Sequence, residues 1–259
     1  MSVLTIFTKY HELLSELTWR EIKQRYKQSV LGYAWVILNP LFQMLVMAFV
    51  FSKIMRMPTL GVPYSIYLYA GLLPWTLFAN SLTGAVNSLV GNAGLITKIY
   101  FPREVFVASA VLAKIVDFLL ATSVFVVFAI YFQTPFTWHL LWILPIFLIQ
   151  QLFTYALALF LAAANLFYRD VQYVFNLVIL IWMYLTPVIY PVELFPDQYR
   201  WIFQLNPMAV IVNAYRQVLL AGAEPNYLSL ALAASLSLIL LTVCFKFFKK
   251  VEGVFADIV

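Results

Sequence analysis

The sequence predicts an all-α integral membrane protein, folded as a single domain over residues 1–259 and built from six transmembrane helices. Two observations lead to this fold class. Hydrophobic residues make up 64% of the 259 residues and charged residues only 10%, whereas a soluble domain has about half apolar and a quarter charged residues. Six continuous apolar stretches are also long enough to cross a bilayer as helices, which takes about 20 residues. They are 30–52, 64–88, 105–132, 140–167, 171–190 and 227–248.

The positive charges indicate how these helices are oriented. If both termini lie inside, the segments between the apolar stretches place eleven lysines and arginines in the cytoplasm and four outside. The positive-inside rule therefore predicts cytoplasmic termini. This topology also explains the net charge of +5, so we expect membrane lipids, and no nucleic acid, as partners of these cations. Because charges run throughout the first thirty residues, we expect no cleaved signal peptide.

Residues 1–29 are predicted to form an amphipathic interface helix before the first crossing. One face carries apolar residues at helical spacing, Phe7, Tyr10, Leu14 and Leu17. A second face carries the cations Arg20, Lys23 and Lys27. Such a helix lies in the membrane interface, with its apolar side in the acyl boundary and its cations toward anionic headgroups. A topology anchor and a role in docking or substrate steering fit this pattern equally well.

The first crossing is interrupted by Asn39 and Pro40. Proline removes one backbone hydrogen bond from a membrane helix and bends it. Asn39 and Gln43 place polar groups at bilayer depth, where they should face protein or water and not lipid. We therefore expect this helix to form the wall of a pore or gate, with an ordinary packing kink as the alternative.

Two segments outside the crossings also differ from plain loops. The inner segment 92–104 is short and charged, with Lys98 and Arg103, and could form one or two helical turns parallel to the membrane. The outer segment 186–226 contains five prolines but is apolar between them. We expect two short helices there, at 199–205 and 208–221, that dip back from the outer surface.

The sequence has no motif of a known catalytic or nucleotide-binding site. It contains no H-E-x-x-H, G-x-S-x-G or P-loop G-x-x-x-x-G-K-[ST] pattern. We therefore expect no catalytic residue, no metal site and no cofactor bound by this chain, so ATP would have to be handled by another chain. Its one cysteine, Cys244, allows no intrachain disulfide. Lys114 and Asp117, three residues apart within a crossing, should form an ion pair; a substrate or proton role is the alternative.

Aromatic residues are abundant, with 23 Phe, 16 Tyr and 7 Trp. Many belong at the two membrane interfaces, but Phe42, Trp182 and Tyr184 fall at mid-depth in predicted crossings. Aromatic faces can stack on the C–H faces of sugar rings and let a polymer slide. Ordinary helix packing is the alternative for each of these residues.

Six motifs in the chain together resemble the polysaccharide-exporting ABC-2 permeases, and most closely the membrane subunits of O-antigen and capsular polysaccharide exporters. They occur in the order of that family and cover nearly the whole chain. They are KQSVLGYAWVILNPLFQMLV at the first crossing, AGLLPWTLF (70–78), YFPREVF (100–106), NLFYRDVQYV (165–174), LTPVIYP (185–191) and LNPMAVIVNAYR (205–216).

The resemblance implies a function and a set of partners. Two copies of such a permease form a channel in the cytoplasmic (inner) membrane. They bind two copies of a P-loop ATPase subunit, which carries the Mg-ATP. The exported substrate is a lipid-linked polysaccharide such as an O antigen or a capsule-like polymer, and the permease itself is not an enzyme.

The resemblance also implies roles for parts of this chain: 1–29 as interface helix, 30–190 as crossings one to five, 191–226 as periplasmic gate helices, and 227–259 as last crossing and cytoplasmic tail. A coupling helix within 92–102 would meet the ATPase through Leu95, Ile96, Lys98, Ile99 and Tyr100. Leu31 and Gly32 would form a loop at the cytoplasmic entrance. The channel would be lined by Tyr33, Trp35, Asn39, Phe42, Gln43, Trp182 and Tyr184. The periplasmic gate would contain Tyr199, Trp201, Phe203, Asn206 and Pro207.

Three other functions compete with this one. An ABC-2 exporter of a small hydrophobic molecule or of a teichoic-acid-like polymer would have the same architecture. A membrane-embedded transferase is disfavoured because the chain lacks clustered acids or histidines. A proton-coupled carrier is disfavoured because only one opposite-charge pair lies within a crossing.

Overall fold

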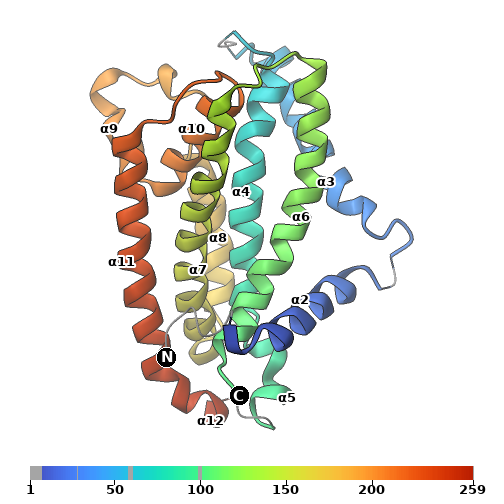
Figure 1. Cartoon of the computed structure of the whole chain (residues 1–259), viewed down its shortest axis with the longest axis vertical. Helices are drawn as coiled ribbons and strands as arrows, with labels where there is room; N and C mark the ends of the chain where they lie inside the picture. The colour runs from blue at the N-terminus through green and yellow to red at the C-terminus, as the bar shows by residue number, and fades with distance from the viewer. Residues whose placement is uncertain (1–7, 28, 58–60, 99–100, 259) are drawn as a thin grey trace.

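The computed structural model of the chain describes residues 8–27, 29–57, 61–98 and 101–258, and all regular structure in these ranges is helical. Six long helices run along the longest axis of the molecule (Figure 1). They are α3 (Ala34–Ala48), continued by the π-helix η1 (Phe49–Ile54), α4 (Tyr64–Val86), α6 (Glu104–Tyr131), α7 (Ile143–Phe167), α8 (Val171–Leu185) and α11 (Tyr227–Val251).

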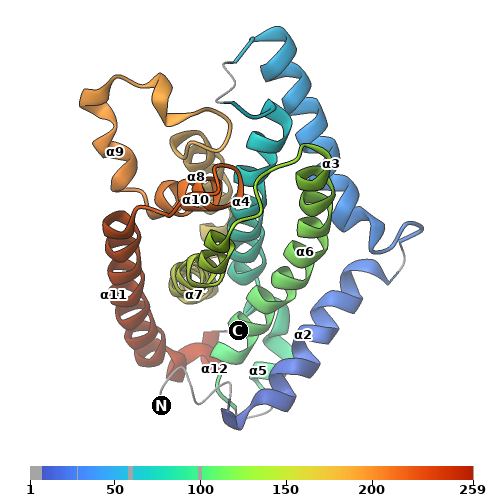
Figure 2. The ribbon, with the colours of Figure 1, turned by 45° about the horizontal axis from the view of Figure 1, so that its top comes forward.

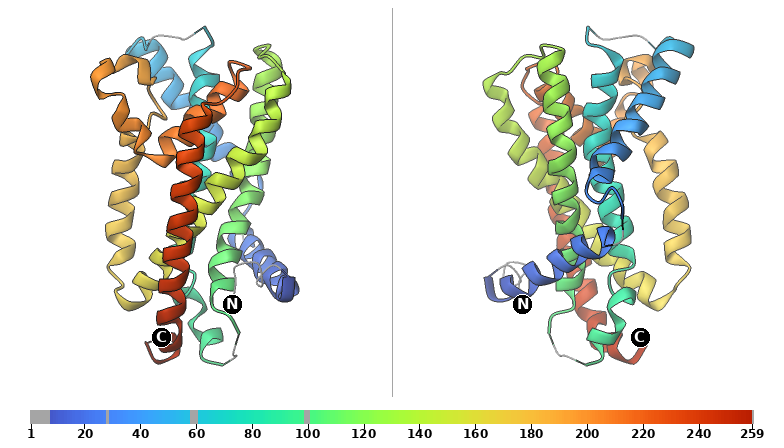
Figure 3. Two further views of the ribbon diagram at one scale, coloured as in Figure 1. Left: turned by 60° about the vertical axis from the view of Figure 1, so that its left-hand side comes forward. Right: turned by 90° about the vertical axis from the view of Figure 1, so that its right-hand side faces the viewer.

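Shorter helices occupy the two ends of this bundle. At one end lie α2 (His11–Tyr26), η2 (Val90–Asn92), α5 (Ala93–Ile96), η6 (Glu252–Val254) and α12 (Phe255–Ile258). At the other end lie η3 (Trp138–Trp142), η4 (Val192–Leu194), η5 (Asp197–Tyr199), α9 (Trp201–Gln204) and α10 (Pro207–Leu219). The helices nearest to the two termini, α2 and α12, therefore share an end with α5 (Figure 3).

Each apolar stretch that the sequence singles out is a helix in the structure. Among the described residues, four helices are long and apolar enough to cross a membrane: Ala34–Ile54, Glu104–Tyr131, Trp138–Phe167 and Tyr227–Val254. The apolar helix α8 is shorter, because Thr186 and Pro187 end it before residue 190. Helix α4 has 23 residues but includes polar side chains such as Thr76 and Asn80.

The core of the bundle surrounds α4. This helix packs against α3, α6, α7, α8 and α10, and its Phe78 ring stacks on Phe153 of α7 with centroids 5.7 Å apart. Pro74 lies inside α4, and its carbonyl accepts a hydrogen bond of 2.7 Å from the buried Gln150 side chain of α7. Helix α11 packs mainly along α7. The Pro74 carbonyl at mid-height is thus paired within the protein, as a low-dielectric surrounding favours.

Helix α2 crosses the base of the bundle at an angle and packs against α6 (Figure 2). Leu14 and Leu17 from its predicted apolar face are only 5% and 6% exposed. The expectation that this face lies in the acyl boundary is therefore wrong for these two residues, since the chain itself buries them. Periodicity identifies an apolar face but does not say which apolar surroundings cover it. Phe7 lies outside the described residues.

The two short outer helices predicted from the sequence correspond to α9 and α10. Asn206 caps α10, because its side chain accepts a hydrogen bond from the backbone N–H of Met208 at 3.1 Å. Pro207 follows at the first helical position, where no N–H is needed. Most residues of α10 are buried against α4, α7 and α11.

Candidate functional site

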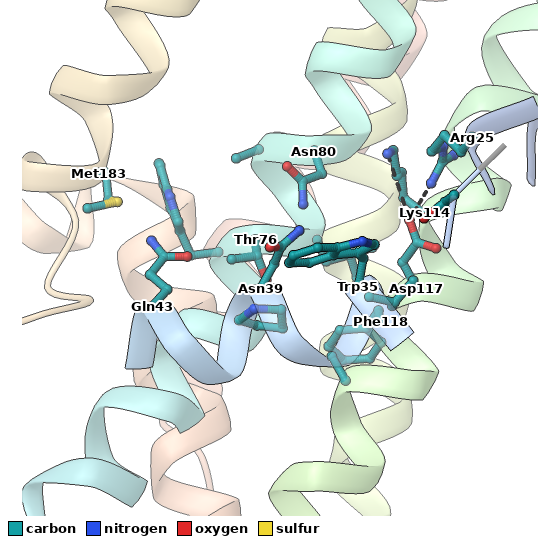
Figure 4. A pocket seen from close by; sticks show the side chains of 17 residues that line it. Arg25, Trp35, Asn39, Gln43, Thr76, Asn80, Lys114, Asp117, Phe118 and Met183 are labelled. Atoms are coloured by element: carbon teal, nitrogen blue, oxygen red, sulfur yellow. Dashed lines mark hydrogen bonds and ion pairs between the residues drawn. The ribbon is translucent and has the colours of Figure 1, made fainter. Parts of the chain in front are cut away.

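A polar cavity of about 630 Å³ opens between α3, α4 and α6 (Figure 4). Trp35, Asn39 and Gln43 line it from α3, at a spacing of four residues that places them on one helix face. Thr76 and Asn80, also four residues apart, line it from α4. The cavity therefore contains three of the residues assigned to the channel wall from the sequence.

Pro40 contributes to the wall of this cavity in two ways. Its ring lines the cavity, and the missing N–H leaves the carbonyl of Val36 without its usual helical donor. Val36 lines the same cavity. The interruption of the hydrogen-bond ladder in α3 thus falls on the side of the helix that faces the polar space.

The carboxamides in the cavity are available to a ligand. Within the described part of the chain, Asn39, Gln43 and Asn80 make no hydrogen bond to another residue. Each can donate two hydrogen bonds and accept two. The indole rings of Trp35 and Trp75 lie along the same wall. The cavity can therefore offer hydrogen bonds to hydroxyl groups together with aromatic surface.

A cluster of three charges closes the cavity near the end of α2. The Arg25 guanidinium donates a hydrogen bond to the Asp117 carboxylate, and Lys114 Nζ lies 3.7 Å from Asp117 Oδ2 (Figure 4). Lys114 and Asp117 thus form the ion pair expected from their spacing. Arg25 could not be predicted from spacing, because it lies 92 residues away from its partner; its hydrogen bond links α2 to α6.

An aromatic groove of about 640 Å³ lies at the C-terminal end of α8. Trp182 forms its base, with its ring edge-on to Phe78 at 5.2 Å and its Nε1–H donating to Asn206 Oδ1 at 3.1 Å. Phe195 and Phe203 stand edge to face at 4.9 Å. The groove is lined by Trp182, Tyr184, Leu185, Tyr190, Phe195, Tyr199, Ile202, Phe203, Leu205, Asn206 and Pro207.

The residues assigned to the channel thus fall into separate places. Trp35, Asn39 and Gln43 share the polar cavity, whereas Trp182 and Tyr184 line the aromatic groove together with four of the predicted gate residues. The fifth gate residue, Trp201, is 57% exposed outside the groove.

Two of the predicted channel residues lie in neither place. Tyr33 borders a cavity beside α2. Phe42 is 55% exposed and does not line the cavity. It directly precedes Gln43, and successive residues of an α-helix are rotated by about 100° around the helix axis. These seven residues therefore do not share one surface within this chain, and their place in a channel formed by two copies stays a prediction.

The loop between α2 and α3 contains the predicted entrance residues. Gly32 has a positive φ of 51°, a conformation that favours glycine, and its N–H donates to Ser29 Oγ at 3.1 Å. Leu31 is 49% exposed beside it. The glycine is needed here for the turn, since no neighbouring atom would crowd a side chain at this position.

The predicted coupling segment forms the short helix α5 next to α12. Ile96 is only 3% exposed, so its side chain is packed inside this chain, and its expected contact with a partner is wrong. Thr97 and Lys98 are exposed at the end of the same helix, and Leu95 is half-buried. Ile99 and Tyr100 lie outside the described residues.

Comparison with known proteins gives consistent results over nearly the whole chain. The family model described as "ABC-2 type transporter" matches residues 12–220. The O-antigen export system permease protein RfbA of Klebsiella pneumoniae is 34% identical over 251 residues, 95% of either chain. The protein of the same name from Myxococcus xanthus is 33% identical over 252 residues, 96% of either chain. The polysialic acid transport protein KpsM of Escherichia coli is 24% identical over 233 residues, 86% of either chain.

Proposed function

Because the chain belongs to the ABC-2 type transporter family, we propose that it is a channel-forming permease that exports a lipid-linked polysaccharide across the cytoplasmic membrane. The polymer is of the O-antigen or a capsule-like kind; the relatives are named for O-antigen export and for polysialic acid transport. ATP hydrolysis on a separate ATPase subunit drives the export. The chain supplies the path and performs no chemistry on the substrate.

The observation that carries this proposal is the pairing of free carboxamides with aromatic surface along the path. Asn39, Gln43 and Asn80 meet the hydroxyl groups of a sugar, and the indole of Trp35 meets its C–H face. The groove around Trp182 offers a second aromatic surface at the outer end. A small hydrophobic cargo would have no use for three carboxamides, since burying them without partners is unfavourable.

We further propose that all six long helices cross the membrane. Helix α4 is long enough, since its 23 residues rise by roughly 35 Å at 1.5 Å per residue. Helix α8 reaches the outer surface together with the broken segment 186–190. The end of the bundle that carries α2, α5 and α12 then lies in the cytoplasm, and α9 and α10 form the periplasmic gate.

A second copy of the chain completes the channel. Helices α3 and α8 each leave a row of large apolar side chains exposed along their length, Phe42, Val46, Phe49, Leu177, Ile181 and Leu185. Two copies that meet along these helices bury these rows and bring two polar cavities to one central path. Phe42 then belongs to the contact between the copies.

Two ATPase subunits bind at the cytoplasmic end and hold the Mg-ATP. The exposed Thr97 and Lys98 at the end of α5 form the contact, and the buried Ile96 anchors the helix to its own chain. Movement of the ATPase subunits is transmitted through α5 to α4 and α6, the two helices that it connects in sequence.

The test is polymer export by membrane vesicles that contain this chain and its ATPase. In the triple variant Asn39→Leu, Gln43→Leu and Asn80→Leu, polysaccharide export should fall at least tenfold while the amount of folded dimer stays normal. The matched control is Asn213→Leu, because Asn213 is exposed on the outer helix α10. Unchanged polysaccharide export in the triple variant would contradict the proposal, as would export of a small hydrophobic molecule in place of the polymer.

A further inference from the structure

Arg216 of α10 is a buried cation held by backbone carbonyls. The residue is 7% exposed. Its Nη1 donates to the Pro187 carbonyl and its Nη2 to the Val188 carbonyl, both at 2.5 Å, and its Nε donates to the Tyr67 carbonyl at 3.3 Å. The guanidinium also lies 3.8 Å from the centre of the Tyr67 ring.

No carboxylate among the described residues forms a salt bridge with Arg216. A buried charge is tolerated only when other groups replace its hydration. Three carbonyl dipoles and one aromatic face do so here. A planar guanidinium can direct N–H groups to several acceptors in its plane at once, which a lysine ammonium cannot do in the same geometry.

Helix α4 is shaped to receive this guanidinium. A Cβ atom added at Gly71 would lie 2.4 Å from Arg216 Nη2 and 3.2 Å from the Val188 carbonyl oxygen. Real Cβ atoms essentially never come as close as 2.4 Å to another atom, and the approach of 3.2 Å to the backbone carbonyl of Val188 is tighter than most real contacts. Glycine at position 71 is therefore required by the close contact between α4, Arg216 and the segment after α8.

The carbonyls that Arg216 holds belong to the break at the end of α8. Other side chains hold the same break: Tyr64 of α4 donates to the Ile189 carbonyl at 2.5 Å, and Asn206 Nδ2 donates to Thr186 Oγ1 at 2.9 Å. Asn206 also accepts the Trp182 indole N–H. The outer end of α8, the start of α10 and α4 are thus joined through residues 186–189.

We propose that Arg216 is a positioning residue that makes the outer end of α8 and helix α10 one rigid body against α4. It acts through the segment 186–189 and keeps the aromatic groove in its shape while a polymer leaves. This role rests on the proposed export function, but the rigidity itself does not.

The test changes the contact between Arg216 and α4 from each of the two helices in turn. Arg216→Lys keeps the charge and loses the planar set of donors, whereas Gly71→Ala leaves the arginine unchanged and displaces it. The matched control is Gly84→Ala in the same helix, where a Cβ would meet only Lys114 Cε at an ordinary 3.7 Å. Each variant is made in the complex with the ATPase, with Cys244 replaced by alanine and with Ile189→Cys as reporter, since Ile189 is only 4% exposed in the segment that is held.

The reporter is labelled by an impermeant maleimide from the outer side. In Arg216→Lys and Gly71→Ala the labelling rate should rise about tenfold, the effect of losing hydrogen bonds to a charged group. Polymer exported per ATP hydrolysed should fall, whereas Gly84→Ala should match the wild type in both measurements. A residue that serves stability alone would lower the amount of folded complex without changing the labelling rate of what remains.

Wild-type labelling and export in both Arg216→Lys and Gly71→Ala would overturn the proposal. If Arg216→Lys fails to fold, the test uses Gly71→Ala and the milder Tyr67→Leu instead. Both are compared with the control Gly84→Ala. If the wild-type complex exports no polysaccharide, the proposed function fails, while the difference in labelling between variants still tests the rigid body.

Discussion

The ammonium group of Lys249 lies 2.6 Å from the carboxylate of Glu104, and Glu104 is fully buried. Glu252 accepts from the same ammonium at 2.8 Å and from the backbone N–H of Arg103 at 2.9 Å. The last turn of α11 is thereby fixed to the first turn of α6. Phe255 of α12 packs beside this contact. The centre of its ring lies 5.2 Å from that of Phe248 and 6.1 Å from that of Phe167.

Lys249→Met should destabilise the protein by about 3 kcal/mol, because it leaves the Glu104 carboxylate buried without its counter-charge. The double variant with Glu104→Gln should recover part of this loss. The measurement is thermal unfolding of the purified protein in detergent, with Lys250→Met as control, since Lys250 is exposed. Equal stability of Lys249→Met and Lys250→Met would show that the ion pair does not hold the two helices together.

Thr97→Glu combined with Lys98→Glu should weaken the binding of the ATPase subunit, because both side chains are exposed at the end of α5. Ile96→Ala should lower stability by about 2 to 4 kcal/mol, since it leaves a cavity inside this chain. Copurification of the two subunits reports the first effect and unfolding the second, with Lys23→Glu on α2 as the control for charge. Normal ATPase binding in the double variant would place the contact elsewhere.

A cysteine at Asp197 should react with an impermeant reagent from outside, and one at Lys250 should react only after the membrane is opened. Both positions are exposed, so burial does not explain a difference, and Cys244 is replaced beforehand. The prediction follows from the cation distribution and from the position of α12 and η5 at opposite ends of the bundle. The reverse labelling pattern would invert the proposed topology.

Pro40→Ala should leave stability equal or higher, since proline inside a helix costs about 3 kcal/mol. Export should nevertheless fall, because Pro40 lines the polar cavity together with Asn39 and Gln43 and a regular helix at this point would change the direction of both carboxamides. Vesicle export is scored beside the amount of folded dimer. Wild-type export in Pro40→Ala would show that the proline in α3 has no role in export and that the helix serves only as structural support.

Phe42→Ala should weaken the dimer and leave the polar cavity unchanged, because Phe42 points away from the cavity and is 55% exposed on α3. The measurement is the dimer dissociation constant in detergent, with Phe136→Ala as control at another exposed aromatic position. A normal dimer dissociation constant together with altered export would show that Phe42 lines the path of the polymer and does not form the dimer contact.

The helices could be predicted from the sequence because membrane-spanning segments must satisfy their backbone hydrogen bonds internally, which makes each one a long apolar run. The bounds of α6 and α7 follow from this within a few residues. The polar face of α3 could be predicted as well, since Asn39 and Gln43 are polar residues in an apolar run.

The contacts between distant segments could not be predicted. Arg25 and Asp117 are separated by 92 residues, and Arg216 and Tyr67 by 149, so no local pattern connects them. The spacing of Trp182 and Tyr184 also gave no sign that they belong to a groove separate from Asn39. Thr76 and Asn80 did carry a signal, four residues apart in the apolar run 64–88, which sequence reasoning passed over.

The arrangement around Arg216 has a consequence for how the chain is made. The carbonyls that accept hydrogen bonds from Arg216 belong to Tyr67, Pro187 and Val188. All three residues precede Arg216 in the chain, so they leave the ribosome first. The arginine can therefore settle among its acceptors as soon as α10 is synthesised, before α11 begins at Tyr227.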